Sequence, residues 1–262
     1  MIEWLVQSNA AHPALSRGLP PDGLLSESEL RRFESLRAEK RRRDWLLGRW
    51  TAKQLLRAYV EQRTAALVPL DTLIVESDPD GAPRIEIGDW RLEIGRPAFN
   101  LQSLIANLQL SISHCDGLAF CAISDGAGVQ IGADIEKVEP RGPGFANDYF
   151  TAEELVQLRT ATLDRRDTVT TLIWSAKEAA LKALRLGLTV DTRAVACTLG
   201  TPAPYEIGWA PLAVYCDPLL LGRRVDGLSG WWRVVDGYVL TLALMQPERH
   251  GIRAPLQTAM AY

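Results

Sequence analysis

The sequence predicts an α+β protein built from two similar halves, and three observations lead to this prediction. Short apolar segments bounded by turn residues are typical of strands. Two longer segments with a helical spacing of apolar residues predict long helices. A helix-start signal, a long helix and a turn before an apolar strand occur in each half in the same order. We place the boundary near 125–128, which gives halves of 1–127 and 128–262.

The first half is predicted to contain a strand, two helices and further strands. Ser26 and Glu29 form a capping box at the start of the first helix. The second helix is expected over about 40–59, where Trp45 and Leu55 supply apolar positions. The predicted strands are Ile2–Val6, Leu73–Glu76, Arg84–Ile87, Trp90–Ile94, Leu110–His114 and Leu118–Ser124.

The second half repeats these signals after a strand predicted at Val129–Glu136. Thr151 and Glu154 form a second capping box, and a long helix is expected from about 166 to 186. A last strand is predicted at Tyr238–Met245, after an Asp-Gly turn like the one that precedes the last strand of the first half.

The two long helices also carry matching tetrapeptides, Trp50-Thr51-Ala52-Lys53 and Trp174-Ser175-Ala176-Lys177. Chance similarity is the alternative explanation for each single match. Four matches in one order favour duplication, and a ligand is then expected in the crevice between the halves.

Composition excludes several classes of protein. Hydrophobic residues make up 47% of the 262 residues, enough for a sizeable core, and the net charge of -3 argues against a general binder of nucleic acid or membrane surfaces. None of the four cysteines lies in a C-x-x-C pair, so a structural zinc site is not indicated. With no signal-peptide pattern and no apolar run of about 20 residues, we expect a cytoplasmic protein with reduced thiols.

The segment from Ile131 to Glu136 is the strongest local signal. Side chains two apart on a strand point to the same side, so Asp134 and Glu136 share one face, opposite Ile131, Ala133 and Ile135. Adjacent carboxylates repel unless a cation lies between them, and magnesium prefers such oxygen ligands. An exposed strand face with two solvated acids is the alternative.

The segment from Trp174 to Lys182 carries a second signal. Glu178 and Lys182 are four residues apart and share a helix face, which also fits an ordinary surface ion pair. In the repeat, Glu178 corresponds to Gln54. Only the second half therefore keeps the carboxylate, as expected for a protein with one active site.

Two further elements could contact phosphate groups. Ser113 and His114 end a predicted strand, and the basic run Lys40–Arg43 is followed on its helix by Arg49 and Lys53. The alternatives are a structural or exposed histidine and a solvated basic helix face.

Together these residues resemble the surfactin-type (Sfp-like) 4′-phosphopantetheinyl transferases. That family carries a G-x-D-x-E strand followed by a W-S-x-K-E-x-x-x-K helix, matched here by Gly132–Glu136 and Trp174–Lys182. Its S-H-[ST] element is matched by Ser113-His114, and its basic G-R-x-x-A-K helix by Gly48–Lys53. The resemblance covers roughly 31–182. The family fold, two α+β halves related by pseudo-two-fold symmetry, accounts for the repeat.

The resemblance implies a magnesium-dependent holo-carrier-protein synthase. Such an enzyme moves the phosphopantetheine arm of coenzyme A to a serine of an acyl, polyketide or peptidyl carrier protein and releases 3′,5′-ADP. The metal ligands would be Asp134, Glu136 and Glu178. The catalytic residues would be Lys182, at the pyrophosphate, and Glu178, which accepts the serine proton directly or through water.

The resemblance also implies the residues that contact coenzyme A: Arg43, Arg49, Ser113, His114, Asp134 and Lys182. The first half would take the 3′-phosphate and adenine, and the second half would carry the metal and catalytic motifs. His114 with Arg43 or Arg49 would bind the 3′-phosphate, and the choice among Arg42, Arg43 and Arg49 stays open. The Pro- and Gly-rich loop 137–145 would lie near the carrier protein, or serve as a plain connector.

The sequence departs from the family pattern at three places. Cys115 follows the histidine where Ser or Thr is usual, Ala82 replaces a common lysine in Gly81-Ala82-Pro83, and the stretch 90–110 is longer than expected.

Three other functions stay open. They are a magnesium-dependent phosphate-ester hydrolase, a non-catalytic module that binds carrier proteins, and a nucleic-acid binder built on Lys40–Arg43, which the net charge disfavours. We expect a monomer with no nucleic-acid or membrane partner, because one chain holds both halves.

Overall fold

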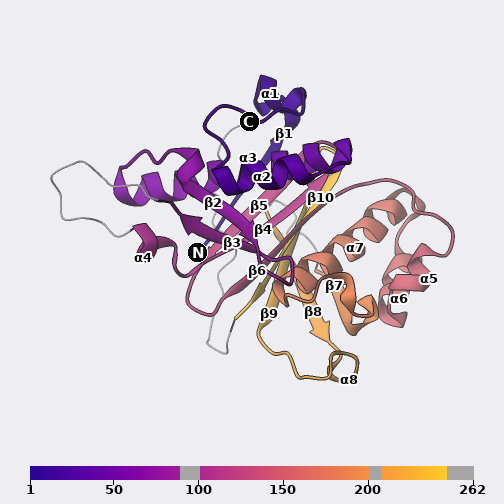
Figure 1. Cartoon of the computed structure of the whole chain (residues 1–262). Helices are drawn as coiled ribbons and strands as arrows, with labels where there is room; N and C mark the ends of the chain where they lie inside the picture. The colour runs from indigo at the N-terminus through magenta and orange to yellow at the C-terminus, as the bar shows by residue number, and fades with distance from the viewer. Residues whose placement is uncertain (89–100, 201–207, 247–262) are drawn as a thin grey trace. The chain divides into compact units, whose positions relative to one another are not determined.

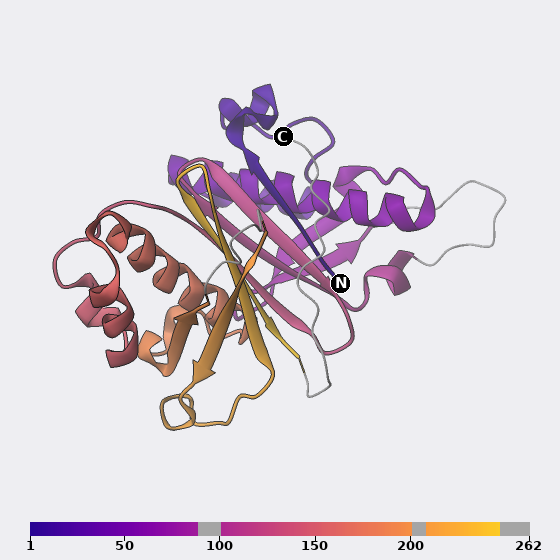
Figure 2. The same cartoon turned by 180° about the vertical axis from the view of Figure 1, so that it is seen from behind.

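The structure is a computed structural model that describes residues 1–88, 101–200 and 208–246. The chain divides into two units, one holding Met1–Ala127 and the other beginning at Gly128. Figures 1 and 2 show the chain from opposite sides. Each unit combines helices with antiparallel sheets, so the α+β prediction is confirmed. The predicted strand Trp90–Ile94 lies outside the described residues.

The first unit contains an antiparallel sheet in the order β1-β5-β4 and a hairpin of β2 and β3. Its strands are β1 (Ile2–Ser8), β2 (Leu73–Ser77), β3 (Pro83–Ile87), β4 (Leu108–Cys115) and β5 (Leu118–Asp125). Its helices are α1 (Pro13–Ser16), α2 (Glu27–Ser35), α3 (Glu39–Thr64) and α4 (Leu101–Ile105), with 3₁₀ turns at Asn9–Ala11 and Leu70–Thr72. Each of these strands includes a predicted strand and is slightly longer.

Helix α3 forms the core of the first unit with the β1-β5-β4 sheet. Leu56 and Tyr59 are buried in one apolar cluster with Leu110 and Cys121 of the sheet. The helix extends beyond its predicted end at Tyr59 and stops before Ala65, whose φ of 56° is left-handed and cannot continue a helix. Packing thus extends a helix that the apolar pattern alone would end earlier.

The second unit contains a five-stranded antiparallel sheet in the order β6-β10-β9-β8-β7. Its strands are β6 (Gln130–Lys137), β7 (Val195–Leu199), β8 (Ala210–Cys216), β9 (Leu228–Val235) and β10 (Tyr238–Met245). Its helices are α5 (Phe145–Tyr149), α6 (Ala152–Thr160), α7 (Arg166–Ala183) and α8 (Pro218–Leu221), with 3₁₀ turns at Leu163–Arg165, Gly187–Thr189 and Thr192–Ala194. The sequence did not predict β7, β8 or β9. Pro211 in β8 and Gly230 in β9 are residues that weaken a strand signal.

Helix α7 packs on this sheet. Leu172, Ala176 and Ala180 are buried in one cluster with Val195 of β7 and Val239 of β10. Figures 1 and 2 show α7 between the sheet and the short helix α5. The helix stops at Ala183, earlier than the predicted 186, because Arg185 has a left-handed φ of 58°.

The two units contain the same succession of elements. Each has a first strand, a capped helix, a long helix, a hairpin and two final strands, and each orders its strands first, last, penultimate. Both predicted capping boxes are present, at Ser26 with Glu29 and at Thr151 with Glu154. Within the described ranges, no helix combines the length and apolarity needed to cross a bilayer.

Candidate active site

Strand β6 and helix α7 meet at Gly132. A Cβ atom on Gly132 would overlap the carbonyl oxygen of Ala179 and would lie 2.7 Å from the backbone nitrogen of Ala183. A side chain at this position would therefore push the strand and helix apart. The glycine of the G-x-D-x-E motif thus brings the two acids of β6 beside the charged pair of α7.

Asp134 is buried beneath this contact, with 1% of its surface exposed. Its Oδ1 accepts a hydrogen bond from Nζ of Lys182 at 2.7 Å, and its Oδ2 accepts one from Oγ of Ser175 at 2.7 Å. Oγ of Ser175 also lies 2.8 Å from Oγ1 of Thr241 on β10. The alternative of two solvated acids on an exposed strand is therefore wrong for Asp134, since both faces of β6 are covered.

Glu178 lies on the α7 face that meets Asp134. Its Oε2 is 3.7 Å from Nζ of Lys182. Burial and then the charge of Asp134 raise the pKa of Glu178 to about 7, while Lys182 acts in the opposite direction. Burial opposes the charge of Lys182, but Asp134 and Glu178 outweigh it and raise the pKa of the amine. The pair is thus part of a buried charge cluster and more than a surface ion pair.

Glu136 completes the acidic cluster. Burial and the charge of Asp134 raise its pKa, against hydrogen bonds from Arg141 and Trp174. The guanidinium of Arg141 donates to Oε2 of Glu136 at 2.8 Å. Sequence reasoning did not single out Arg141. Its position in the loop 137–145, directly after the acidic strand, was the signal that could have indicated a contact with Glu136.

The donor set is chemically suited to a hard divalent cation, because Asp134 raises the pKa of both Glu136 and Glu178 and a cation would relieve this repulsion. Among the residues that the structure describes, no three His, Cys, Asp or Glu side chains converge closely enough to hold a metal ion in this geometry. In this geometry Lys182 and Arg141 balance the acids instead. Both are flexible side chains that can turn aside without a change in the backbone.

An aromatic cluster borders Glu136. The ring of Trp174 lies 5.2 Å from the rings of both Phe145 and Tyr149, measured between centroids. The guanidinium of Arg141 lies 5.5 Å from the centroid of Phe145. Helix α5 and the motif helix α7 therefore pack together beside Glu136.

The first unit holds a basic cavity of about 520 Å³. Its lining residues are Ala38, Lys40, Arg41, Asp44, Trp45, Gly48, Arg49, Ile112 and His114. Arg49 is 7% exposed and lies 4.6 Å from the centroid of Trp45. Its Nε has no hydrogen-bond partner among the described residues, and burial lowers its pKa. A buried cation with an unused donor on a cavity wall is suited to an anionic ligand.

The cavity contains only some of the expected phosphate contacts. His114 lines it, with Nδ1 3.8 Å from Oδ2 of Asp44. Ser113 is buried. Because it directly precedes His114 on β4, its side chain points to the face of the strand opposite that of His114. Arg43 is not a lining residue and pairs with Glu39 at 2.7 Å. Lys40 and Arg41 of the same basic run line the cavity in its place.

The matching strand registers show which residues correspond in the two units. Asp134 pairs with Thr241 across β6 and β10, and the equivalent position on β1 is Leu5. By the same alignment Gln7 corresponds to Glu136, as Gln54 does to Glu178. In the other direction, Val234 of β9 corresponds to His114 of β4. The acids therefore occur in one unit and the cavity histidine in the other.

Comparison with known proteins finds relatives of this chain. Residues 130–229 match the sequence pattern of the 4′-phosphopantetheinyl transferase superfamily. The chain is 26% identical over 142 residues to the 4′-phosphopantetheinyl transferase HetI of Nostoc sp., across 52% of this chain and 59% of HetI. It is 24% identical over 159 residues to the 4′-phosphopantetheinyl transferase psf-1 of Bacillus pumilus, across 60% of this chain and 59% of psf-1. These matches confirm the resemblance, and the matched segment spans about three fifths of each relative's length.

Two solved structures are similar over smaller parts. The holo-[acyl-carrier-protein] synthase of Neisseria meningitidis aligns with 45% of this chain and 98% of its own, at 21% identity and a TM-score of 0.36. The synthase of Bacillus anthracis, solved in complex with coenzyme A (3′,5′-ADP), aligns with 47% and 91% of the two chains, at 18% identity and a TM-score of 0.33.

Proposed function

We propose that this chain, which carries the sequence pattern of the 4′-phosphopantetheinyl transferases, transfers the phosphopantetheine arm of coenzyme A to a serine of an apo carrier protein. The observation that supports this most is the charge cluster of buried Asp134 with partly buried Glu136, Glu178 and Lys182, which unites both family motifs at the contact of β6 with α7.

Asp134, Glu136 and Glu178 are the residues that would hold magnesium. The metal would neutralise phosphate charge and favour the displacement at phosphorus. Lys182 contacts Asp134 and Glu178. With a metal ion to balance these acids, its flexible amine would be available to contact the pyrophosphate. Ser175 keeps Asp134 in place through its hydrogen bond at 2.7 Å.

The reaction forms one bond and breaks one bond at the same phosphorus. The carrier serine oxygen bonds to the phosphorus that bears pantetheine, and the bond to 3′,5′-ADP breaks. The serine proton passes to Glu178, directly or through a water molecule. In the metal-free protein, burial and then the charge of Asp134 raise the pKa of Glu178 to about 7, so this carboxylate is more basic than an ordinary glutamate.

The cavity of the first unit would take the 3′-phosphate of coenzyme A. Arg49 and His114 face it, together with Lys40 and Arg41. We therefore revise the expected set for this phosphate. Of the candidates Arg42, Arg43 and Arg49, we keep Arg49, and we add Lys40 and Arg41, which line the cavity.

Intact-mass measurement of an apo carrier protein tests the proposed function. After incubation with the chain, coenzyme A and magnesium, the carrier should gain the mass of phosphopantetheine, and EDTA should prevent the gain. Acyl, polyketide and peptidyl carriers should be compared in parallel, because the sequence does not choose among them. Consumption of coenzyme A without carrier would instead support a phosphate-ester hydrolase. Binding of a carrier with no mass change would support a non-catalytic module.

We further propose that the active species is a monomer, because the acids and the phosphate cavity occur in different units of one chain. Analytical ultracentrifugation of the active protein would show a single species of 29.0 kDa.

A further inference from the structure

Each unit contains one fully buried ion pair at the same position of the repeat. In the second unit, Nζ of Lys177 lies 2.8 Å from Oε2 of Glu154, and both side chains are 0% exposed. In the first unit, Lys53 pairs with Glu29, with side chains 0% and 1% exposed. The lysines are the last residues of the matching tetrapeptides, and the glutamates are the third residues of the two capping boxes.

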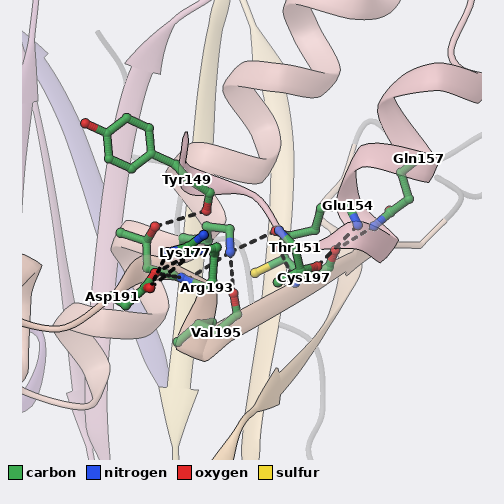
Figure 3. A network of polar contacts seen from close by, with 10 residues as sticks. Tyr149, Thr151, Glu154, Gln157, Lys177, Asp191, Arg193, Val195 and Cys197 are labelled. Atoms are coloured by element: carbon green, nitrogen blue, oxygen red, sulfur yellow. Dashed lines mark hydrogen bonds and ion pairs between the residues drawn. The ribbon is translucent and has the colours of Figure 1, made fainter. Parts of the chain in front are cut away.

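The pair of the second unit joins three elements (Figure 3). Oε1 of Glu154 accepts a hydrogen bond at 2.7 Å from the backbone nitrogen of Cys197 on β7, and Oε2 accepts one at 2.8 Å from that of Thr151. Lys177 donates to the carbonyl oxygens of Thr192, at 3.0 Å, and Val195. The start of α6, the middle of α7 and the start of β7 are therefore tied to one point.

The pair of the first unit joins the equivalent elements. Glu29 accepts hydrogen bonds from the backbone nitrogens of Val75 on β2, at 3.0 Å, and Ser26, at 2.9 Å. Lys53 donates to the carbonyl oxygen of Leu24 at 2.7 Å. Val75 is the third residue of β2, as Cys197 is of β7. The backbone partners of the two glutamates thus correspond. The lysine acceptors differ, since Leu24 lies before α2, whereas Thr192 and Val195 lie just before and at the start of β7.

A buried ion pair of this kind restricts movement more than it adds stability. Two apolar residues of similar volume can be as stable or more so, whereas separating buried opposite charges is costly. The pair therefore fixes the rotation and axial position of its long helix. On α7, Lys177 directly precedes Glu178, and Lys182 follows little more than one turn later. On α3, Lys53 lies one turn after Arg49.

Both units keep the buried ion pair, although only the second unit has the three acids. The equivalents of the acids are Leu5, Gln7 and Gln54, yet the first unit keeps its own lysine and glutamate. What the two helices share is the need to hold charged side chains against a strand. Lys182 of α7 contacts Asp134 of β6, and Arg49 of α3 lines the basic cavity with His114 of β4.

We propose that the two buried pairs act on different sides of the reaction. Glu154 and Lys177 are positioning residues for Glu178 and Lys182, whereas Glu29 and Lys53 are positioning residues for Arg49. This inference rests on the proposed function and goes beyond it, since none of these four residues touches coenzyme A or the carrier serine.

Two double variants test the inference against each other. Glu154→Gln with Lys177→Met and Glu29→Gln with Lys53→Met each remove both charges of a pair, leave no unpaired buried charge and preserve the shape of the side chains. Thermal unfolding measures the structural cost, which should be similar because both pairs are equally buried. The functional effects should differ.

The variant of the second unit should lower kcat by about 10–100-fold, the range expected when a catalytic group shifts by about an ångström. Its preference for coenzyme A over dephospho-coenzyme A should not change. The variant of the first unit should raise the KM for coenzyme A about tenfold or more, by the same reasoning. Its KM for dephospho-coenzyme A and its kcat at saturation should stay near the wild-type values.

Equal kcat and KM effects in both variants, in proportion to lost stability, would show that the pairs are only structural. If a double variant does not fold, the single variants Glu154→Asp and Glu29→Asp carry the same test, because aspartate keeps the charge opposite the lysine and only shortens the side chain. Calorimetric binding separates the two proposals. Wild-type protein that binds coenzyme A but transfers nothing would refute the proposed function. Loss of the preference for coenzyme A over dephospho-coenzyme A in both variants, or in neither, would refute the positioning roles.

Discussion

Replacing Gly132 by alanine should separate the two elements that form the candidate active site. The added Cβ would overlap the carbonyl oxygen of Ala179 and lie 2.7 Å from the backbone nitrogen of Ala183. Both are backbone atoms inside a packed helix, so no side chain can rotate to make room. The strand or the helix must shift, and overpacking of this kind typically costs about 1–3 kcal/mol.

The expected change in stability is measurable by thermal unfolding. For a chain of this size the cost corresponds to a fall in Tm of roughly 3–10 °C. Transfer to a carrier protein should fall more steeply than stability, by about 10²-fold for a displacement near 1 Å, because Asp134 and Glu178 lie on the elements that separate. The assay is initial rate at a temperature where circular dichroism shows both proteins fully folded.

Gly142→Ala is the matched control. Gly142 lies in the loop after β6 and has no other atom within 4 Å of its Cβ position, so the variant should match the wild type in stability. If Gly132→Ala is as stable as Gly142→Ala and as active as the wild type, the close approach of β6 and α7 does not position the acids, and the reasoning is refuted.

Four further predictions follow from the site. Glu178→Gln should lower single-turnover transfer by about 10²–10⁴-fold while calorimetric affinity for coenzyme A changes little; a near-normal rate would assign the proton to water. Burial and Asp134 raise the pKa of Glu178 from 4.5 to about 7. The contribution of this group to the free energy of unfolding is therefore fully present below pH 4.5, and without metal up to about 3 kcal/mol of it should be lost as the pH rises to 7. Magnesium or Glu178→Gln should flatten this dependence in urea unfolding, and an unchanged slope would contradict the pKa shift. His114→Ala should raise the KM for coenzyme A more than that for dephospho-coenzyme A, and equal effects would exclude a contact with the 3′-phosphate. Asp134→Asn should abolish metal-dependent transfer and keep the hydrogen bond from Ser175, so a variant that circular dichroism shows to be unfolded would make Asp134 structural.

The burial of Asp134 changes the expected result of replacing it. On sequence grounds the acid lies on a ligand face whose loss leaves the fold largely intact, and its removal relieves repulsion between like charges. The structure instead places it at 1% exposure, with Lys182 and Ser175 on its two oxygens. Truncation to alanine would leave a buried amine without this partner. Asparagine is therefore the better substitution, since it retains one acceptor oxygen and the side-chain volume.

Local sequence signals predicted the capped helices, the long helices and the strands of the first unit, but they missed β7, β8 and β9. Ser26 with Glu29 and Thr151 with Glu154 form capping boxes because a hydroxyl and a carboxylate three residues apart satisfy each other's backbone donors without outside help. The strand at Tyr238–Met245 has the predicted bounds because a tight turn and a continuous apolar run specify it locally. The repeat was readable for the same reason, since its markers are short motifs in a fixed order.

Only the tertiary structure decided which residues meet. The role of Gly132 depends on Ala179 and Ala183 of α7, far along the chain. The ion pairs of Glu154 and Glu29 depend on lysines that sequence reasoning treated as part of a repeat and, for Lys53, also as a candidate phosphate contact. The rotation of α3 places Arg41 on the cavity wall and Arg43 against Glu39, which a basic run does not reveal because every residue in it carries the same charge. Chemistry that resides in one short motif can be read from sequence. Burial and cross-element distance cannot, because they arise from packing between segments that are distant in the chain.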